Sequence, residues 1–397
     1  MTLLVAWLLA APVQAETLAT HTVTVRAADR AYPAAPLVAT LPVPAGDVRG
    51  AVLVPEAGGD AVPGQVETAE GRLRVTWIEP PLQPGDERTY RLELTDGAAA
   101  TPDAVALSEV EGAVEVRLDG ELFTRYCYAG GPFPYCYPII GPTGGPVTRA
   151  WPMEEQPGEA RDHAHHRSWW FTHGDVNGVD FWTSGEGQGR EVHEALEAVV
   201  SGPVMGVLRA RNNWVAPDGV RVCEEVREYR FYRLPDCRLA DLTVTLTASD
   251  GPVVFGDTKE GTMGLRVAET MRVDAGTGHI MNANGQRDGE AWGKSAPWCD
   301  CYGPVEGETV GIAVFDHPES LRHPTYWHVR IYGLFAANPF GVRAFTGDEG
   351  QDGRYELAAG ASITFRYRVY IHWGGTEAAD VAGAYAAFAG PPEVTVR

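Results

Sequence analysis

Short runs of alternating apolar and polar residues recur along almost the whole chain, and they restrict its fold more than any other feature. Because successive side chains of a strand point to opposite faces of a sheet, this period of two predicts strands. Helical periodicity is nearly absent, and only residues 380–388 predict a short helix. We therefore predict an all-β protein made of antiparallel sheets. The clearest predicted strands are residues 22–26, 72–77, 113–118, 204–210, 227–232, 239–246 and 364–370.

The 397 residues are enough for more than one domain, and a Gly-Ala-Ala-Ala-Thr-Pro segment at 97–102 has the composition of a linker. Residues 16–100 predict a small β-sandwich, and residues 105–395 predict a large antiparallel two-sheet sandwich. Residues 1–15 have the apolar run and small-residue cleavage site of a secretory signal peptide, which predicts export to the periplasm or the medium. That segment is too short to span a bilayer, and no other stretch predicts a membrane span.

Charge narrows the possible partners. The net charge of −21 disfavours nucleic acid, because proteins bind polyanions by neutralising phosphates with Lys and Arg. Only two of the 32 basic residues are lysines, Lys259 and Lys294, and both lie in Gly-rich polar segments. In such segments, the ammonium group of a lysine would bind different partners from the guanidinium group of an arginine.

Six cysteines are an even number, which in an exported chain is compatible with disulfides. Short sequence separations favour two pairs, and a Cys-x-Cys spacing predicts two free or distantly paired thiols. The pairs are Cys127 with Cys136 and Cys223 with Cys237, and the remaining thiols are Cys299 and Cys301.

Residues 162–182 hold four of the eleven histidines together with three aspartates and three tryptophans, a density typical of a functional site. If this block is a strand, His163 and His165 lie on one face and His166 lies on the other, so only two of the three share a site directly. Aromatic side chains beside them indicate a sugar ring. They are equally typical of a sandwich core, where alternation would not bury both Trp169 and Trp170.

Two chemical interpretations of the block stay open. In the first, His163 and His165 bind a divalent metal with His328 and a carboxylate, either Asp162 or Glu260. In the second, no cofactor is needed.

In that second interpretation, Glu260 acts as general base and His173 or His328 as general acid across a sugar. Alternation on a strand would point Lys259 away from Glu260, so Lys259 is expected to contact substrate or another carboxylate. Asp162 is as compatible with a simple turn as with a site.

Several motifs resemble a bacterial domain family labelled "methane oxygenase PmoA", over roughly residues 105–375. The true methane monooxygenase subunit of that name is a multi-helix membrane protein, so the resemblance does not imply methane oxidation. It implies an exported protein of bacteria that degrade complex carbohydrate, with a galactose-mutarotase-like supersandwich. The matching motifs are Tyr-Pro-Ile-Ile-Gly-Pro at 137–142, Asp-His-Ala-His-His-Arg-Ser at 162–168, Gly-Asp-Thr-Lys-Glu-Gly at 256–261, and residues 146–149, 173–182 and 333–341.

Together these observations predict a carbohydrate-active enzyme, a hydrolase, lyase or epimerase, that acts on a glycoside or an oxidised sugar. Alternatives are a non-catalytic carbohydrate-binding protein and a metal-dependent oxygenase. Beyond the acid–base and metal-ligating residues above, we expect Arg167, Lys259, Arg330 and Asn338 to orient hydroxyl groups, and Trp170 and Trp327 to bind substrate.

Overall fold

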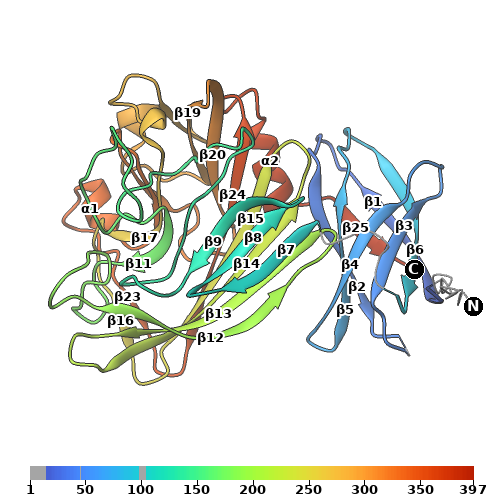
Figure 1. Cartoon of the computed structure of the whole chain (residues 1–397), viewed down its shortest axis with the longest axis horizontal. Helices are drawn as coiled ribbons and strands as arrows, with labels where there is room; N and C mark the ends of the chain where they lie inside the picture. Colours follow the sequence, from blue (N-terminus) through green and yellow to red (C-terminus); the bar gives the residue numbers. More distant parts are fainter. Residues whose placement is uncertain (1–14, 45, 98–103) are drawn as a thin grey trace, which may run out of the picture.

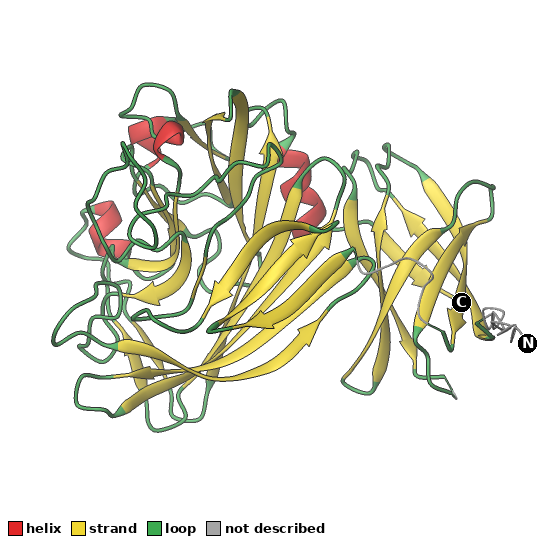
Figure 2. Ribbon diagram, in the orientation of Figure 1, coloured by secondary structure: helices red, strands yellow, loops and turns green. Residues whose placement is uncertain are grey.

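The computed structural model describes residues 15–44, 46–97 and 104–397. Apart from Ala15, the predicted signal peptide lies outside these residues, as does most of the predicted linker. Strands dominate the described chain (Figure 2). The predicted helix is confirmed as α2 (Val381–Ala389), and the other α-helix is the short α1 (Val342–Thr346). In the described part of the chain, neither helix has the length and apolar character needed to cross a membrane.

The N-terminal strands form a seven-stranded antiparallel sheet in the order β2-β5-β4-β3-β6-β1-β25. Edge strands β2 and β25 contact each other, so the sheet curls around a core of its own that includes Trp77 and Leu92. Figure 1 shows β25, in red, among the blue strands: the end of the chain returns to the first sheet, which the sequence did not predict. The strands are β1 (Thr17–Arg26), β2 (Ala35–Pro42), β3 (Gly50–Pro55), β4 (Val62–Ala69), β5 (Arg72–Glu79), β6 (Glu87–Thr95) and β25 (Glu393–Val396).

The rest of the chain forms two eight-stranded antiparallel sheets. The first, in the order β21-β22-β17-β11-β10-β9-β8-β7, contains β7 (Val105–Val110), β8 (Ala113–Leu118), β9 (Glu121–Cys127), β10 (Tyr135–Cys136), β11 (Trp169–His173), β17 (Gly261–Arg266), β21 (Tyr326–Val329) and β22 (Leu334–Asn338). The second, in the order β12-β13-β14-β15-β24-β20-β19-β18, contains β12 (Arg190–Val200), β13 (Met205–Val215), β14 (Arg221–Arg233), β15 (Arg238–Thr247), β18 (His279–Asn282), β19 (Trp298–Val305), β20 (Glu308–Asp316) and β24 (Ser362–Trp373). A small pair, β16 (Val253–Phe255) and β23 (Tyr355–Leu357), and two 3₁₀ turns, η1 (Glu269–Met271) and η2 (Asp288–Ala291), complete the elements.

One apolar core joins the inner faces of these two sheets. Trp169 on β11 packs edge-on against Tyr229 on β14, with ring centroids 5.0 Å apart, and Phe231 stacks beside Tyr229. Burial of each such side chain contributes about 1.5–3 kcal/mol. The prediction of an all-β fold with a large two-sheet sandwich is confirmed.

The outer face of β11 is buried as well. Trp170 points away from Trp169, yet both side chains are fully buried, because Trp170 lies in a second apolar cluster with Trp182 and Leu334. Gly264 pairs with Trp170 across the sheet, and a Cβ there would lie 2.6 Å from the indole. The expectation that only one of the two tryptophans would be buried is wrong, because loops cover this sheet on the side where alternation predicts solvent.

Polar contacts attach the first sheet to the sandwich. The Oε1 atom of Gln65 accepts hydrogen bonds from the backbone N–H groups of Val204 and Met205, at 3.2 and 3.0 Å. Glu67 forms a two-point ion pair with Arg230 at 2.7 and 3.0 Å. The two parts therefore pack together through partly buried, directional contacts.

All six cysteines lie in the described chain and are free thiols. Cys223 and Cys237 lie at opposite ends of the β14–β15 hairpin, and Cys127 and Cys136 face opposite sides of adjacent strands. Both predicted disulfides are therefore wrong: short sequence separation does not bring side chains together when the intervening residues form extended strands.

A buried ion pair lies within the second sheet. The two ring nitrogens of His372 approach the carbonyl of Trp373 at 3.2 Å and the carboxylate of Asp300 at 3.3 Å, so both can donate only if the ring is an imidazolium. The Thr376 hydroxyl donates to the same carboxylate at 2.6 Å. Burial alone would lower the pKa of His372, but the charge and hydrogen bond of Asp300 outweigh it and raise that pKa.

This pair predicts a stability that depends on pH. A raised pKa in the folded state means that the contribution of His372 is complete below its unfolded pKa of about 6.5 and is lost as the pH rises through the folded value. The difference in unfolding free energy between the wild type and His372→Gln should therefore shrink between pH 6 and pH 9 in urea titrations. A difference that stays constant over this range would contradict the assignment.

Candidate functional site

A buried arginine holds the loop that carries the histidine block. Arg149 donates to the backbone carbonyls of Trp151, Ala160, Asp162 and His163 at 3.0–3.2 Å, and also to the Asp162 carboxylate. A loop outside any sheet leaves carbonyls that need donors, and a guanidinium offers five N–H groups in one plane. Arg149 thus supplies the hydrogen-bond donors that a neighbouring strand would otherwise provide for this segment.

Asp162 joins two buried arginines and a histidine. Besides Arg149, its carboxylate accepts from Arg266 at 3.0 Å and contacts Nδ1 of His163 at 2.7 Å. Burial opposes ionisation, but the charge of Arg266, the His163 hydrogen bond and Arg149 together lower the pKa of Asp162 well below its usual range. Asp162 is therefore a fixed counter-ion and is more than the turn residue that the sequence also allowed.

The three adjacent histidines meet in one cluster. Residues 161–168 form a loop and not a strand, and His163 adopts a left-handed backbone conformation with φ of 46°. The ring centroids of His163 and His166 lie 4.7 Å apart in a stack, and His165 lies crosswise, 4.5 Å from His166. The prediction that only two of the three could share a site is wrong, because it assumed the alternation of a strand.

A column of rings runs through this cluster. Tyr332 stacks on His163 at 5.2 Å, His163 stacks on His166, and His166 stacks on buried Trp170 at 5.3 Å. Trp170 is therefore the base of the column. Trp170 was predicted to bind substrate, but its ring is fully buried and is not available to stack on a ligand.

Burial disfavours the charged form of two imidazoles in the cluster, the partly buried His165 and the buried His166. Burial lowers the pKa of His165 to about 4, although nearby Glu260 and Asp180 oppose this shift. Burial also lowers the pKa of His166, whose Nδ1 lies 3.2 Å from a guanidinium nitrogen of Arg266. Because arginine only donates, this nitrogen of His166 is the unprotonated one.

Lys259 and Glu260 lie in the bend that precedes β17, and their side chains form an ion pair. The expected separation of the two is wrong because neither residue belongs to a strand. Glu260 remains partly exposed, with 31% of its side chain accessible. Its charge opposes the lowering of the pKa values of His165 and His328, so the carboxylate lies near both imidazoles.

Asn338 holds this bend in place. Its amide donates to the carbonyl of Thr258 at 2.9 Å, and its carbonyl oxygen accepts from the N–H groups of Phe340 and Gly341 at 2.9 and 3.1 Å. The side chain is fully buried. Asn338 is therefore a positioning residue for the Lys259–Glu260 bend. It was predicted to orient substrate hydroxyl groups directly, and its burial and hydrogen bonds do not agree with that role.

The β21–β22 hairpin forms the opposite side of the site. His328 on β21 is buried, and its Nδ1 has no hydrogen-bond partner in the described chain. Burial lowers its pKa to about 4, and Glu260 opposes that shift. Arg330 and Tyr332 follow in the hairpin turn, with the guanidinium of Arg330 5.5 Å from the centre of the Tyr332 ring.

Three other predicted residues lie elsewhere. His173 is fully buried, and its Nε2 donates to the carbonyl of Gly256 at 2.9 Å, while burial lowers its pKa to about 4. Trp327 lies in the main core, where its indole donates to the carbonyl of Ala296 at 2.8 Å. Arg167 packs over Tyr135 at 5.4 Å, beside Cys127. A buried ring or imidazole has no surface that a substrate can contact, so His173 and Trp327 are not part of the candidate site.

The predicted metal ligands do not form a coordination sphere. Among the residues that the structure describes, no group of three or more His, Cys, Asp or Glu side chains is arranged to hold a metal ion. Nδ1 of His163 is engaged by Asp162, and Asp162 is engaged by two arginines. The donor set of His163, His165 and His328 with Asp162 or Glu260 therefore does not fit a metal in this arrangement.

Arg149, Arg266 and Tyr332 are the contributors that the sequence analysis missed. Arg149 stands within a motif that had been singled out, at 146–149, and Tyr332 directly precedes another, at 333–341, but an arginine or tyrosine in a polar loop carries no signal of its own. Arg266 is the last residue of β17, two positions after Gly264. Its role depends on contacts with residues about 100 positions away.

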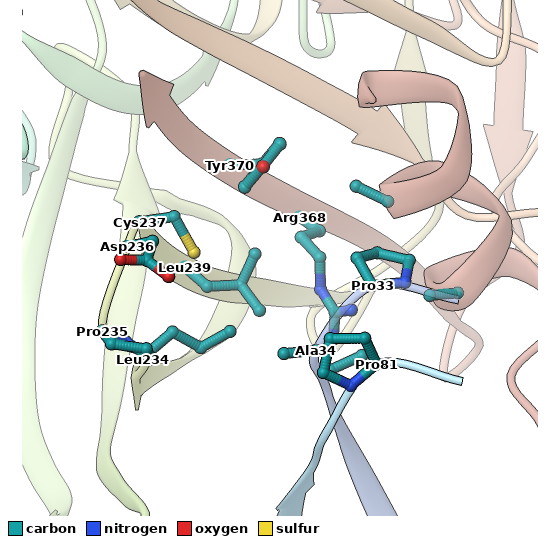
Figure 3. Close-up of a pocket in the computed structure, with 13 residues that line it drawn as sticks. Pro33, Ala34, Pro81, Leu234, Pro235, Asp236, Cys237, Leu239, Arg368 and Tyr370 are labelled. Carbon is teal, nitrogen blue, oxygen red and sulfur yellow. The ribbon is translucent and has the colours of Figure 1, made fainter. Parts of the chain in front are cut away.

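A cavity of about 210 Å³ lies where the first sheet meets the sandwich (Figure 3). Two of its polar groups are not available to a ligand: Arg368 pairs with Asp241 at 2.6 and 2.8 Å, and burial raises the pKa of the Cys237 thiol to about 12. Asp236 is exposed and is the acidic group in the lining. It is lined by Pro33, Ala34, Ala35, Pro81, Leu234, Pro235, Asp236, Cys237, Leu239, Arg368, Tyr370, Ala384 and Ala387.

Residues 113–386 match the model of a family of unknown function, DUF6807, and the chain belongs to this family. No curated protein matches the chain. Among solved structures, it is similar to a protein in the glycosyl hydrolase family 38 from Enterococcus faecalis, with a TM-score of 0.40, and to an alpha-mannosidase from Enterococcus faecalis V583, with a TM-score of 0.42. Both are 9% identical and cover 95% of this chain, which spans only 47% and 46% of theirs. Likeness at this level carries no functional argument.

The Asp162 contacts predict a loss of stability on Asp162→Asn. Removing one charge leaves two buried arginines without a counter-ion, and breaking hydrogen bonds to charged groups should lower the unfolding free energy by about 2 kcal/mol. Urea unfolding measures the change, with Asp29→Asn at an exposed position as the control. An Asp162→Asn variant as stable as that control would show that the contacts do not hold the loop.

Proposed function

We propose that this chain is an exported, carbohydrate-processing enzyme that removes a proton from its substrate, with Glu260 as the general base. The observation that carries the proposal is the position of Glu260: a partly exposed carboxylate paired with Lys259, near enough to His165 and His328 for its charge to affect their pKa values. A base of this kind needs an accessible carboxylate within reach of a substrate proton. The carbohydrate class and the export rest on the resemblance and on the apolar segment at residues 1–15.

A single available carboxylate favours a lyase or an epimerase over a hydrolase. Most glycoside hydrolases use two carboxyl groups, one as acid and one as base or nucleophile. Here Asp162 is engaged by two arginines, and Asp180 accepts hydrogen bonds from the N–H groups of Trp182 and Thr183 and from the Thr183 hydroxyl. Of the described carboxylates around the histidine cluster, Glu260 pairs with Lys259 alone and stays partly exposed, so it is the best placed for proton transfer.

The remaining groups have roles that differ from those predicted. His328 was predicted as an acid, but a pKa of about 4 leaves it neutral at pH 7, so it acts as a hydrogen-bonding partner for hydroxyl groups, as does His165. The ammonium of Lys259 offsets negative charge that develops on substrate oxygen as Glu260 takes the proton.

The proposal predicts that Glu260→Gln abolishes turnover but not binding. The amide keeps the size and hydrogen bonds of the side chain but cannot accept a proton, and the loss of a general base lowers the rate by about 100-fold to 10,000-fold. Turnover of glycosides, uronate-containing oligosaccharides and keto-sugars is followed by mass spectrometry, and binding by calorimetry, with exposed Glu349→Gln as the control. Binding without turnover by the wild type would instead indicate a carbohydrate-binding protein, and turnover that requires dioxygen would indicate an oxygenase.

A further inference from the structure

The turn that carries Arg330 is held rigidly beside the site. The N–H of Arg330 donates to Leu334 at 2.7 Å, and that of Gly333 donates back to Arg330 at 2.9 Å, which closes the hairpin. The carbonyl of Ile331 accepts from the N–H groups of Val273 and Asp274 at 3.0 and 3.2 Å. Contacts on both sides therefore fix the backbone from which the guanidinium extends.

Aromatic rings cover the guanidinium of Arg330. It lies 5.8 Å from the centre of the Trp292 ring and 5.5 Å from that of Tyr332. Rings of this kind stabilise a cation and limit its motion without using its N–H groups. Within the described chain, no carboxylate lies within ion-pairing distance of Arg330, and its side chain has no hydrogen-bond partner. The N–H groups of the Arg330 guanidinium are therefore available to bind a ligand.

Three other cations around the site already have partners. Arg149 and Arg266 share Asp162, and Lys259 pairs with Glu260. The guanidinium of Arg330 lies over the ring of Tyr332, which stacks on His163, and both Arg330 and Glu260 affect the pKa of His328. The unpaired cation and the proposed base therefore both lie close to the histidine cluster. In a chain with a net charge of −21, an unpaired cation at this position selects for a negative substrate group.

We infer that the substrate is an acidic saccharide whose carboxylate binds Arg330, while Glu260 removes the proton from the adjacent carbon. This inference rests on the proposed function. A guanidinium binds a carboxylate through two parallel N–H bonds, and neutralising that carboxylate makes the neighbouring C–H bond easier to ionise.

The chemistry balances without a further reactant. The C–H bond breaks, its proton moves to Glu260, and its electron pair passes into the carboxylate, where Arg330 and Lys259 offset the added charge. The electron pair then either takes a proton from solvent water on the opposite face, which inverts the carbon while Glu260 returns its proton to the hydroxide, or expels the oxygen substituent on the next carbon, which takes the proton from Glu260 as a C=C bond forms. The first outcome is epimerisation and the second is elimination.

The test compares oligosaccharides of glucuronate with the corresponding glucose oligosaccharides by calorimetry and by turnover, at low and high salt. We expect binding of the acidic series alone, weakened by salt, and a rise in Kd of about 10-fold to 100-fold in Arg330→Gln. Arg330→Lys should bind with intermediate affinity, because it keeps the charge but loses the two-point geometry. Arg72→Gln, at an exposed position of the first sheet with no ion pair in the described chain, is the control.

The outcomes separate this inference from the proposed function. Equal binding of both series, binding of neither, or an Arg330→Gln variant that binds glucuronate oligosaccharides normally would overturn the acidic substrate, even if Glu260→Gln abolishes turnover of another sugar. Arg330-dependent binding of the acidic series with turnover unaffected by Glu260→Gln would leave the recognition in place and remove the proposed base.

Discussion

Two buried arginines that share one carboxylate support the whole site. Arg149 satisfies the carbonyls of the histidine loop, Arg266 fixes the unprotonated nitrogen of His166, and Asp162 balances both charges. A segment with this many backbone groups outside a sheet would otherwise have to face water. Because the arginines hold it down, the loop covers the outer face of β11 and buries Trp170 beneath three imidazoles.

That burial decides where charge resides in the site. The imidazoles of His165, His166 and His328 lose their charge at neutral pH because desolvation disfavours the cation. Charge that is available to a ligand is left on the Lys259–Glu260 pair and on Arg330, around the rim of the cluster. This distribution of charge favours proton transfer at the Glu260 carboxylate, beside the cations Lys259 and Arg330. A block of histidines considered by itself would instead indicate metal binding or imidazolium chemistry.

Much of the fold was readable from local pattern. Residues 113–118 form β8 within the same bounds, and residues 239–246 lie within β15, because alternation there matches a sheet with one face in the core. Local pattern failed where the chain leaves the sheets. The side chains of the histidine block and of Lys259 and Glu260 were placed by the alternation of a strand, and Cys223 was paired with Cys237 across a hairpin whose length separates them.

The sequence alone determined the all-β class, the predominance of antiparallel strands and the segments that carry the chemistry, because these depend on residue type and short-range periodicity. Only the tertiary structure decided which side chains meet. It places Glu260 near His328 and stacks Tyr332 on His163, it buries His173 and Trp327, and it gives Arg330 no counter-ion among the described residues. The physical reason is that burial and the pairing of charges depend on contacts between residues far apart in the chain, which no local pattern contains.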